Sequence, residues 1–144
     1  MKIDQIDLRI VEILETNGRV PNNEIAAKLS ISEGTVRNRI KKLTDNNLLR
    51  VKGLLNPDEG TGRQLIYILV TLVMTKNWKE IAQHVSELPH VKSVSMITGR
   101  FDLIIELFIE SQNLISFLTE QLSTVGEIKS TESLVTIKNF KKWV

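Results

Sequence analysis

Two short helical patterns separated by only three residues, 30–32, constrain the fold of this chain more than any other feature. Apolar residues at helical spacing predict a helix over residues 22–29, with a buried face made of Ile25, Ala26 and Leu29. A further helix is expected over residues 33–46, with Ser32 as its N-cap, because a serine oxygen can accept a hydrogen bond from the first turn. Two helices joined by so short a turn form a helix-turn-helix.

An amphipathic helix is predicted to precede this pair. Apolar residues recur every three or four positions near the start of the chain, and they are Ile3, Ile6, Ile10, Val11, Ile13 and Leu14. Asp4 followed by Asp7 resembles a capped start, where acidic side chains suit the positive end of a helix. Gly18 is expected to end the helix in the left-handed conformation, which glycine adopts without strain.

The helix over residues 33–46 has one apolar and one cationic face. At about 100° per residue, Val36, Ile40 and Leu43 share a narrow arc that faces the core. The polar residues on the opposite arc, on its flank and at the N-cap are the predicted DNA-binding residues: Ser32, Gly34, Thr35, Arg37, Asn38, Lys41 and Lys42. Arg and Asn can hydrogen-bond base edges bidentately, whereas Lys neutralises phosphates. The pattern predicts a recognition helix for double-stranded DNA, and an ordinary solvated helix is the alternative.

The distribution of charge supports the DNA-binding hypothesis. The net charge is only +2, but residues 33–52 carry six basic and two acidic side chains, a local balance of +4. From residue 64 to the end, eight basic side chains meet eight acidic ones. The chain has no cysteine, which excludes disulfides and thiolate metal sites, and no apolar run long enough to span a membrane. We expect a cytoplasmic protein without a cofactor, a metal or a membrane partner.

The second half of the chain alternates between strand-like and helix-like segments. A short strand over residues 48–55, a possible wing, precedes a loop over residues 56–63 that contains Gly, Pro, Asn and Asp. Strand, helix, strand, strand, helix and strand then follow over residues 65–75, 77–87, 91–98, 101–110, 114–122 and 128–137. This is the order of a ferredoxin-like βαββαβ domain.

The predicted fold class is therefore α+β. A helix-turn-helix, winged-helix-like domain is expected over residues 1–55, and a linker over residues 56–63. A ferredoxin-like domain for effector binding and oligomerisation is expected over residues 64–144. Two helices can cover only one face of its sheet. Yet successive positions of the third predicted strand are apolar, namely Leu103, Ile104, Ile105, Leu107, Phe108 and Ile109. An uncovered apolar face predicts a homodimer formed through the sheets, which suits a protein that reads two half-sites.

Short motifs along nearly the whole chain together resemble one family. They are Ile6-Asp7-Leu8-Arg9-Ile10, Gly18-Arg19, Glu24-Ile25-Ala26, Leu29-Ser30-Ile31-Ser32, Arg39-Ile40 with Leu43, Asn56-Pro57, Pro89 with Val91, Thr98-Gly99-Arg100-Phe101-Asp102-Leu103, and Thr131 with Ser133. In this order and spacing they resemble the Lrp/AsnC (feast/famine) family of bacterial and archaeal regulators. The sequence departs from the family pattern at Pro21, Ser30, Asn47, Ser133 and the segment Arg50-Val51-Lys52. These departures leave the operator and the effector open.

The resemblance implies an amino-acid or related effector bound where dimers meet. It assigns the effector-binding residues to the hairpin turn and the last strand: Thr98, Gly99, Arg100, Phe101, Asp102, Thr131 and Ser133. It also implies that dimers assemble further, commonly to octamers or rings, and that they bend or wrap DNA. The predicted function is a sequence-specific transcriptional regulator whose assembly and DNA affinity respond to such an effector.

Three alternatives stay open at the level of sequence. The hairpin turn could be purely structural, with Asp102 hydrogen-bonding local backbone. Siroheme decarboxylases are similar in architecture, and such an enzyme would use His84, His90 and Arg100 around a tetrapyrrole. The third alternative is an architectural DNA-binding protein that does not respond to an effector.

Overall fold

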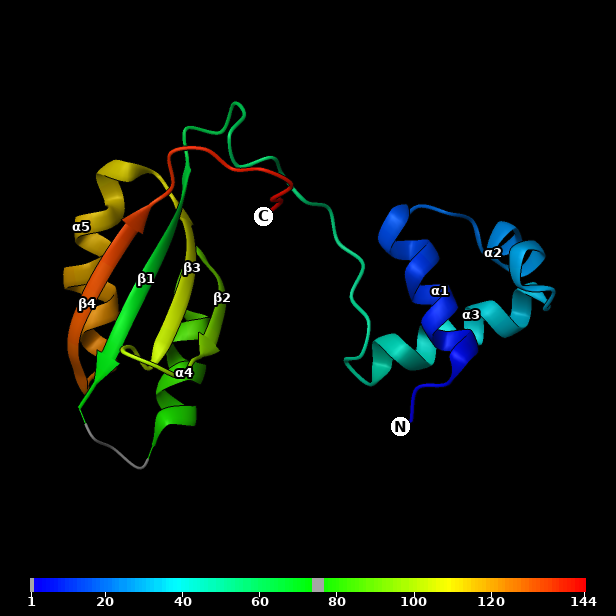
Figure 1. Cartoon of the computed structure of the whole chain (residues 1–144), viewed down its shortest axis with the longest axis horizontal. Coiled ribbons are helices and arrows are strands. Elements are labelled where there is room, and N and C mark those ends of the chain that lie inside the picture. The colour runs from blue at the N-terminus through cyan, green and yellow to red at the C-terminus, as the bar shows by residue number, and fades with distance from the viewer. Residues whose placement is uncertain (1, 74–76) are drawn as a thin grey trace. The chain divides into compact units, whose positions relative to one another are not determined.

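The computed structural model describes residues 2–73 and 77–144, which form two compact units divided between Gly53 and Leu54 (Figure 1). The first unit is built from helices, and the second combines helices with a four-stranded sheet. Within these residues, no helix is both long enough and apolar enough to cross a membrane.

Three helices form the first unit: α1 (Gln5–Thr16), α2 (Asn22–Leu29) and α3 (Glu33–Asp45). A capping box begins α1, because Asp4 accepts from the Asp7 N–H at 2.9 Å and Asp7 accepts from the Asp4 N–H at 3.1 Å. The helices meet at a fully buried centre to which each contributes one residue: Ile10, Ile25 and Val36. All three expected helices are confirmed.

Local chemistry decides where these helices end. Asn17 ends α1 in an extended conformation (φ −150°), and its side-chain oxygen accepts from the Arg19 N–H at 2.9 Å. The left-handed conformation expected at Gly18 is wrong, because this asparagine turn has already ended the helix. Ser30 takes the left-handed conformation instead (φ 55°) and ends α2. Ser32 caps α3 as predicted, accepting from the Thr35 N–H at 3.1 Å.

The strand expected over residues 48–55 is wrong. In the described chain the first strand begins at Gln64. The N–H groups of Leu48 and Leu49 both donate to the Leu43 carbonyl, at 2.9 and 3.2 Å, so the backbone folds over the end of α3. The polypeptide therefore leaves α3 as a capping turn, and the helix-turn-helix carries no wing strand in this segment.

The second unit has the predicted strand and helix order. Its elements are β1 (Gln64–Leu72), α4 (Trp78–Glu87), β2 (Val91–Met96), β3 (Leu103–Ile109), a helical stretch and β4 (Ile128–Val135). The helical stretch comprises the short 3-10 helix η1 (Ser111–Asn113), α5 (Leu114–Ser116), the π-helical η2 (Phe117–Gln121) and the short 3-10 helix η3 (Leu122–Val125). The sheet is antiparallel with strand order β2-β3-β1-β4. This order confirms the ferredoxin-like domain.

Both helical segments cover the same face of this sheet (Figure 1). The core between them contains alternate residues of the two central strands: Ile66, Ile68, Val70 and Leu72 from β1, and Leu103, Ile105, Leu107 and Ile109 from β3. The helices contribute Ile81, Val85, Phe117 and Leu122. Phe108 and Leu65 point to the other face, where Val144 buries them. The open face is thus partly covered by the end of the same chain, which the sequence did not reveal.

Candidate DNA-binding and effector sites

The exposed side of α3 carries the predicted DNA-binding residues. Arg37, Asn38, Lys41 and Lys42 are exposed, while Val36 and Leu43 of the same helix are buried. A 13-residue helix built this way presents a continuous polar ridge, because positions three and four apart lie on one face. The structure brings the four side chains together on one helix, as the spacing of about 100° per residue predicts.

Two of these cations form ion pairs along the helix. Arg37 Nη2 lies 2.5 Å from Glu33 Oε1, and Lys41 Nζ lies 2.6 Å from Asp45 Oδ2. All four side chains are roughly half to two-thirds exposed, so each pair is worth at most about 1 kcal/mol. Water and a phosphate can replace such partners at little cost, and the pairs keep the cations extended along the surface.

The first turn of α3 is arranged differently. Ser32 Oγ accepts from the Thr35 N–H, and the two hydroxyl groups also hydrogen-bond each other at 2.8 Å. Both side chains therefore serve first as the cap of the helix. Gly34 lies between them with open space around it, because a Cβ atom there would meet only Ser32 Oγ at 3.9 Å. The fold does not require a glycine at this exposed position.

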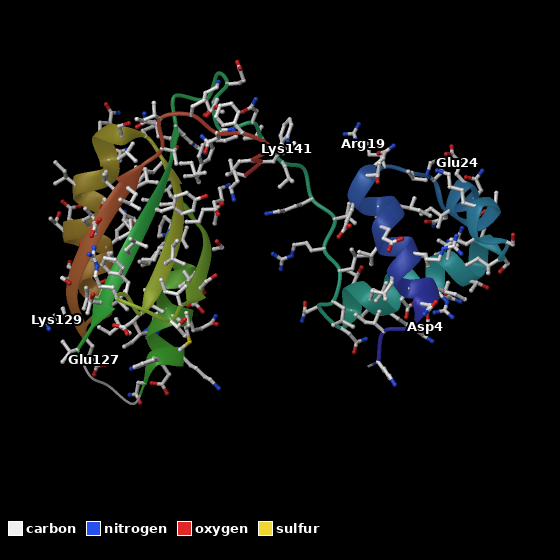
Figure 2. All side chains as sticks on the ribbon, in the orientation of Figure 1. Asp4, Arg19, Glu24, Glu127, Lys129 and Lys141 are labelled. Atoms are coloured by element: carbon white, nitrogen blue, oxygen red, sulfur yellow. The ribbon has the colours of Figure 1, made fainter. Side chains whose placement is uncertain are left out.

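Arg39 is the cation of α3 that faces the protein. Its Nη1 donates to Asp4 Oδ2 at 2.6 Å and to Asp7 Oδ1 at 2.8 Å. Asp7 is the one buried charged residue in the described chain, at 2 % exposure, so its charge depends on this partner. Figure 2 shows Asp4 at the start of α1, the end that this contact joins to α3. Sequence reasoning identified the two aspartates as a cap and missed the arginine.

The ion-pair cluster has a clear electrostatic signature. The pKa of Asp4 is lowered, first because its carboxylate accepts from the Asp7 N–H and second because Arg39 donates to it. The pKa of Arg39 is raised, chiefly by its hydrogen bond to Asp4 and then by the one to Asp7. A groove of about 460 Å³ opens beside this cluster, lined by Lys2, Asp4, Asp7, Thr35, Asn38, Arg39 and Lys42. Three predicted DNA-binding residues, Thr35, Asn38 and Lys42, lie along it.

The predicted effector hairpin joins β2 to β3. The Ile97 N–H donates to the Asp102 carbonyl at 2.9 Å and closes a turn in which Gly99 has a φ of 120°, a value that side chains disfavour. Thr98, Gly99 and Arg100 are exposed, and Phe101 and Asp102 are half-buried. The Arg100 guanidinium lies over the Phe101 ring, 4.8 Å from its centroid.

Asp102 fastens this hairpin to β1. Its N–H donates to the Val70 carbonyl at 2.8 Å, and its Oδ2 accepts from the Leu72 N–H at 2.7 Å. The register between β1 and β4 shifts between Thr71 and Leu72, and an irregularity of this kind disrupts the ladder locally. The Asp102 carboxylate supplies the acceptor that the Leu72 N–H needs. This contact favours a structural role for the side chain.

The predicted effector residues of β4 and the partner of Arg100 lie on different faces of the sheet. Thr131 and Ser133 pair with Val70 and Ile68, so they share the face that the helices cover. Arg100 instead reaches Glu132, with Nη2 and Oε2 3.1 Å apart, and Glu132 lies on the opposite side of the strand from its neighbours. The structure therefore divides the seven residues into a hairpin group and a strand group.

Thr131 lines a groove that the sequence did not indicate. The groove has a volume of about 380 Å³ and lies between η3 and β4. Its walls are Leu118, Leu122, Ser123, Gly126, Glu127, Ile128, Lys129, Ser130 and Thr131. Figure 2 shows Glu127 and Lys129 together at the start of β4. An apolar floor, hydroxyl groups and one charge of each sign are features that a zwitterion can use.

The two histidines lie apart from these sites in sequence and on different elements. His84 is in the last turn of α4, and His90 precedes β2 with a φ of 68°; both are exposed. In residues 2–73 and 77–144, no three His, Asp or Glu side chains are grouped in a way that could hold a metal ion. Arg100, the third residue of the enzyme alternative, pairs with Glu132.

Comparison with known families agrees with both halves of this description. The model of the AsnC-type helix-turn-helix domain matches residues 3–44, and that of the Lrp/AsnC ligand binding domain matches residues 65–143. The chain belongs to the Lrp/AsnC family. It is therefore a DNA-binding transcriptional regulator with a ligand-binding domain.

Relatives of this Lrp/AsnC regulator match along their full length. It is 32% identical to an HTH-type transcriptional regulator of Pyrococcus furiosus, across 98% of this chain and 95% of the relative. It is 30% identical to the HTH-type transcriptional regulator Ptr1 of Methanocaldococcus jannaschii, across 96% and 95% of the two chains. Such relatives are regulators, in line with a function that is not enzymatic.

Solved structures share the architecture. A transcriptional regulator of Neisseria meningitidis in complex with L-Met has a TM-score of 0.76 at 26% identity, covering 98% of this chain and 94% of its own. The leucine response regulatory protein LrpA of Mycobacterium tuberculosis has a TM-score of 0.84 at 19% identity, covering 97% and 96%. The latter supports the fold alone.

Proposed function

We propose that this Lrp/AsnC regulator reads DNA by placing α3 in the major groove. The observation that carries the proposal is the single exposed ridge of Arg37, Asn38, Lys41 and Lys42 on a helix whose other side is buried. Arg37 and Asn38 would hydrogen-bond base edges, and the two lysines would neutralise phosphates. A good bidentate base contact discriminates by about 1–3 kcal/mol, which exceeds the value of the exposed pairs that it displaces.

The open space at Gly34 supports this proposal. An alanine would fit there without a clash and would favour the helix by about 1 kcal/mol, so stability alone gives no reason for glycine. Close approach of the DNA backbone to the first turn of α3 would be a reason for glycine at this position. Ser32 and Thr35 contribute by holding that turn through their mutual hydrogen bonds.

An operator selected from a random duplex pool provides the test. Arg37→Ala should weaken binding to it by about 1–3 kcal/mol and relax the base preference at one position, measured by fluorescence anisotropy. Lys41→Ala should weaken binding to every duplex and reduce the slope of log K against log salt by about 1. The matched control is Arg9→Ala, which removes an exposed cation from α1. If Arg37→Ala and Lys41→Ala both bind like the parent, α3 is not the reading helix.

We further propose that the effector is a free amino acid. A relative of this fold has been solved in complex with L-Met, and this chain carries groups suited to both ends of such a ligand. Arg100 is 78% exposed and can bind a carboxylate, while Glu132 beside it can accept from an ammonium. Thr131 lies on the other face of the sheet, in the groove between η3 and β4, and marks a second candidate site, where its hydroxyl can donate or accept a hydrogen bond.

Asp102 has a different role in this proposal, as do Gly99 and Phe101. The Asp102 carboxylate holds the turn on β1, Gly99 permits the turn, and the Phe101 ring lies under the Arg100 guanidinium. Thr98 belongs to the same turn and would shape this site, whereas Ser133 shares the helix-covered face with Thr131. Such a division predicts that Arg100 controls the affinity of a ligand bound at the hairpin and Thr131 that of a ligand bound in the groove, whereas Asp102 controls the stability of the hairpin.

A thermal-shift screen against the amino acids tests the effector proposal, because a ligand that prefers the folded state raises the unfolding temperature. Arg100→Ala should reduce the shift caused by an amino acid bound at the hairpin, and Thr131→Ala that of one bound in the groove, in both cases without lowering the unfolding temperature of the free protein. The control is Lys92→Ala, which removes another exposed cation of the same domain. Full shifts in both site variants would contradict the assignment.

We also propose that the regulator works as a homodimer that assembles further, with an octamer as the expected form. Its support is the sheet face opposite the helices, where Leu69 and Ile104 are only half-buried, together with exposed apolar groups such as Leu134. Two copies that join these faces would present two recognition helices. Light scattering on the parent and on Ile104→Glu tests this: the variant should shift to the monomer, and a monomeric parent would refute the proposal.

A further inference from the structure

The connection between the two units is shorter than the sequence suggests. On the first unit, Val51 Cγ1 lies 3.2 Å from the position that a Cβ atom would take on Gly18, so the chain is still packed there at residue 51. On the second unit, the N–H of Leu55 donates to the Val144 carbonyl at 2.8 Å, and the Val144 N–H donates back at 3.0 Å. Only residues 52–54 separate these two points of attachment.

Asp58 holds the next part of the expected linker. Its Oδ2 accepts from the Asn139 N–H at 3.0 Å, and its Oδ1 accepts from the Asn139 side-chain amide at 2.6 Å. Lys138 Nζ lies 3.1 Å from Oδ2. The Asp58 side chain is 13% exposed, so these contacts are better shielded from water than the ion pairs on α3. We call these three residues the Asp58 clamp.

The end of the chain is itself attached to the sheet. Residues 136–144, the C-terminal strap, begin where Thr136 Oγ1 donates to the Leu65 carbonyl at 2.8 Å. Lys142 Nζ lies 2.8 Å from Glu106 Oε2 on β3, and Val144 is buried against Leu65 and Phe108. The strap therefore connects residues 55–58 to the sheet.

We infer that the C-terminal strap and the Asp58 clamp are positioning elements for DNA binding, which keep the tether of each DNA-binding unit at about three residues. The inference rests on the proposed dimer, because a tether matters when two recognition helices must reach two half-sites together. With the strap released, the chain is next held at Gln64, the start of β1, and the tether extends over residues 52–63.

The expected effect follows from the length of the tether. A flexible tether lowers the effective concentration of the second recognition helix roughly as the −3/2 power of its length once it exceeds the required span. A change from three residues to twelve is fourfold, which corresponds to about an eightfold loss, although tethers this short deviate from the ideal law. We therefore expect affinity for a two-half-site duplex to fall by roughly five- to tenfold, and affinity for a single half-site to stay unchanged.

A disulfide can close and open the strap in one polypeptide. Leu55 and Val144 exchange both backbone hydrogen bonds, and residues paired in this way have Cα atoms about 5.5 Å apart, within the range of a disulfide. The chain has no cysteine, so Leu55→Cys with Val144→Cys creates a single pair. The variant also carries Asp58→Ala, which removes the clamp. In the reduced form residue 55 is then held by the two backbone hydrogen bonds to residue 144, and a terminal pair of this kind opens at little cost in free energy. Its oxidised and reduced forms are compared with the parent on duplexes that contain one or two selected half-sites.

The oxidised form should bind the two-half-site duplex like the parent, and the reduced form five- to tenfold more weakly, with equal binding to the single half-site. Equal affinity of the two forms for the longer duplex would overturn the inference. So would an equal loss on both duplexes, since that result would mean that the strap acts on folding, which far-UV circular dichroism would register. A parent that is monomeric by light scattering and gains nothing from a second half-site would instead refute the proposed dimer.

Discussion

The two units secure their functional surfaces in different ways. On α3, the cap and the ion pairs join residues three or four positions apart, such as Ser32 with Thr35 and Arg37 with Glu33. In the second unit, Asp102 reaches back 30 residues to Leu72, Arg100 pairs with Glu132, and Asp58 pairs with Asn139 across 81 residues. The proposed DNA-binding face is thus a property of one helix, whereas the proposed effector surface exists only when the sheet is assembled.

Arg39 is the exception in the first unit, and it shows what the local contacts cannot do. The pairs along α3 hold its side chains in place but do not fix the helix against its neighbours. Arg39 does so, because it joins α3 to the two aspartates that begin α1, 32 and 35 residues away. Breaking local and distant contacts separately should therefore give very different losses of stability.

The largest effect is expected at Arg39. Arg39→Ala leaves the buried Asp7 carboxylate without its cation, and removal of one partner of a buried pair costs roughly 3 kcal/mol or more. Urea unfolding of the full chain, followed by far-UV circular dichroism, should show an early transition of the helical unit. The matched control is Arg37→Ala, whose exposed pair with Glu33 contributes less than about 1 kcal/mol. Equal losses of unfolding free energy in the two variants would show that local and distant contacts stabilise the helical unit equally.

An intermediate effect is expected at Asp102. Asp102→Ala leaves the Leu72 N–H without its acceptor at the irregularity of β1, and such a loss costs about 1–3 kcal/mol. The unfolding transition of the second unit should move to lower urea, with ligand affinity retained wherever the unit is folded. Arg100→Ala, which removes a surface pair from the same turn, should leave this transition in place. The opposite pattern would make Asp102 a ligand contact.

The smallest effect is expected from acid. The pKa of Asp4 is lowered in the folded protein, first by the Asp7 N–H, and that of Asp58 is lowered, first by the Asn139 amide. A carboxylate with a lowered folded pKa adds stability that is present above its unfolded pKa, near 4, and is lost as the pH falls through the folded value. Thermal unfolding between pH 5 and 2.5 should show this loss. Asp4→Asn, which keeps a side-chain cap, should flatten the dependence for the helical unit; an unchanged slope would mean that other carboxylates control it.

Features that depend on contacts between residues close in the sequence were predicted correctly, and features that depend on contacts between distant residues were not. The helices, the Ser32 cap and the polar ridge of α3 could be predicted, because helical periodicity and capping act within one or two turns. The strand expected over residues 48–55 failed for the opposite reason. Its residues have a suitable pattern, but a strand needs a neighbour, and Leu48 and Leu49 bond to the end of α3 instead.

In the second unit, too, local features could be predicted from the sequence and distant contacts could not. Alternation of apolar residues was enough to predict four strands and their order, since a period of two specifies which side chains face the core. The predicted hairpin residues proved to lie on a turn, but the sequence contained no sign that Asp102 bonds β1 or that Thr131 and Arg100 face opposite sides. Those facts depend on the register between strands that are distant in the chain.

Sequence alone determined the two-part architecture, the helix-turn-helix and the side of α3 that is exposed, because each rests on the periodicity of apolar residues within the elements. Tertiary structure decided how α3 is anchored, on which faces of the sheet the predicted effector residues lie, and how few residues separate the attachments at Val51 and Leu55. Arg39, Asp102 and Asp58 each act on a partner 30 or more residues away. Contacts of that range form only when the chain has folded, since loop closure brings together groups whose spacing in the sequence carries no periodic signal.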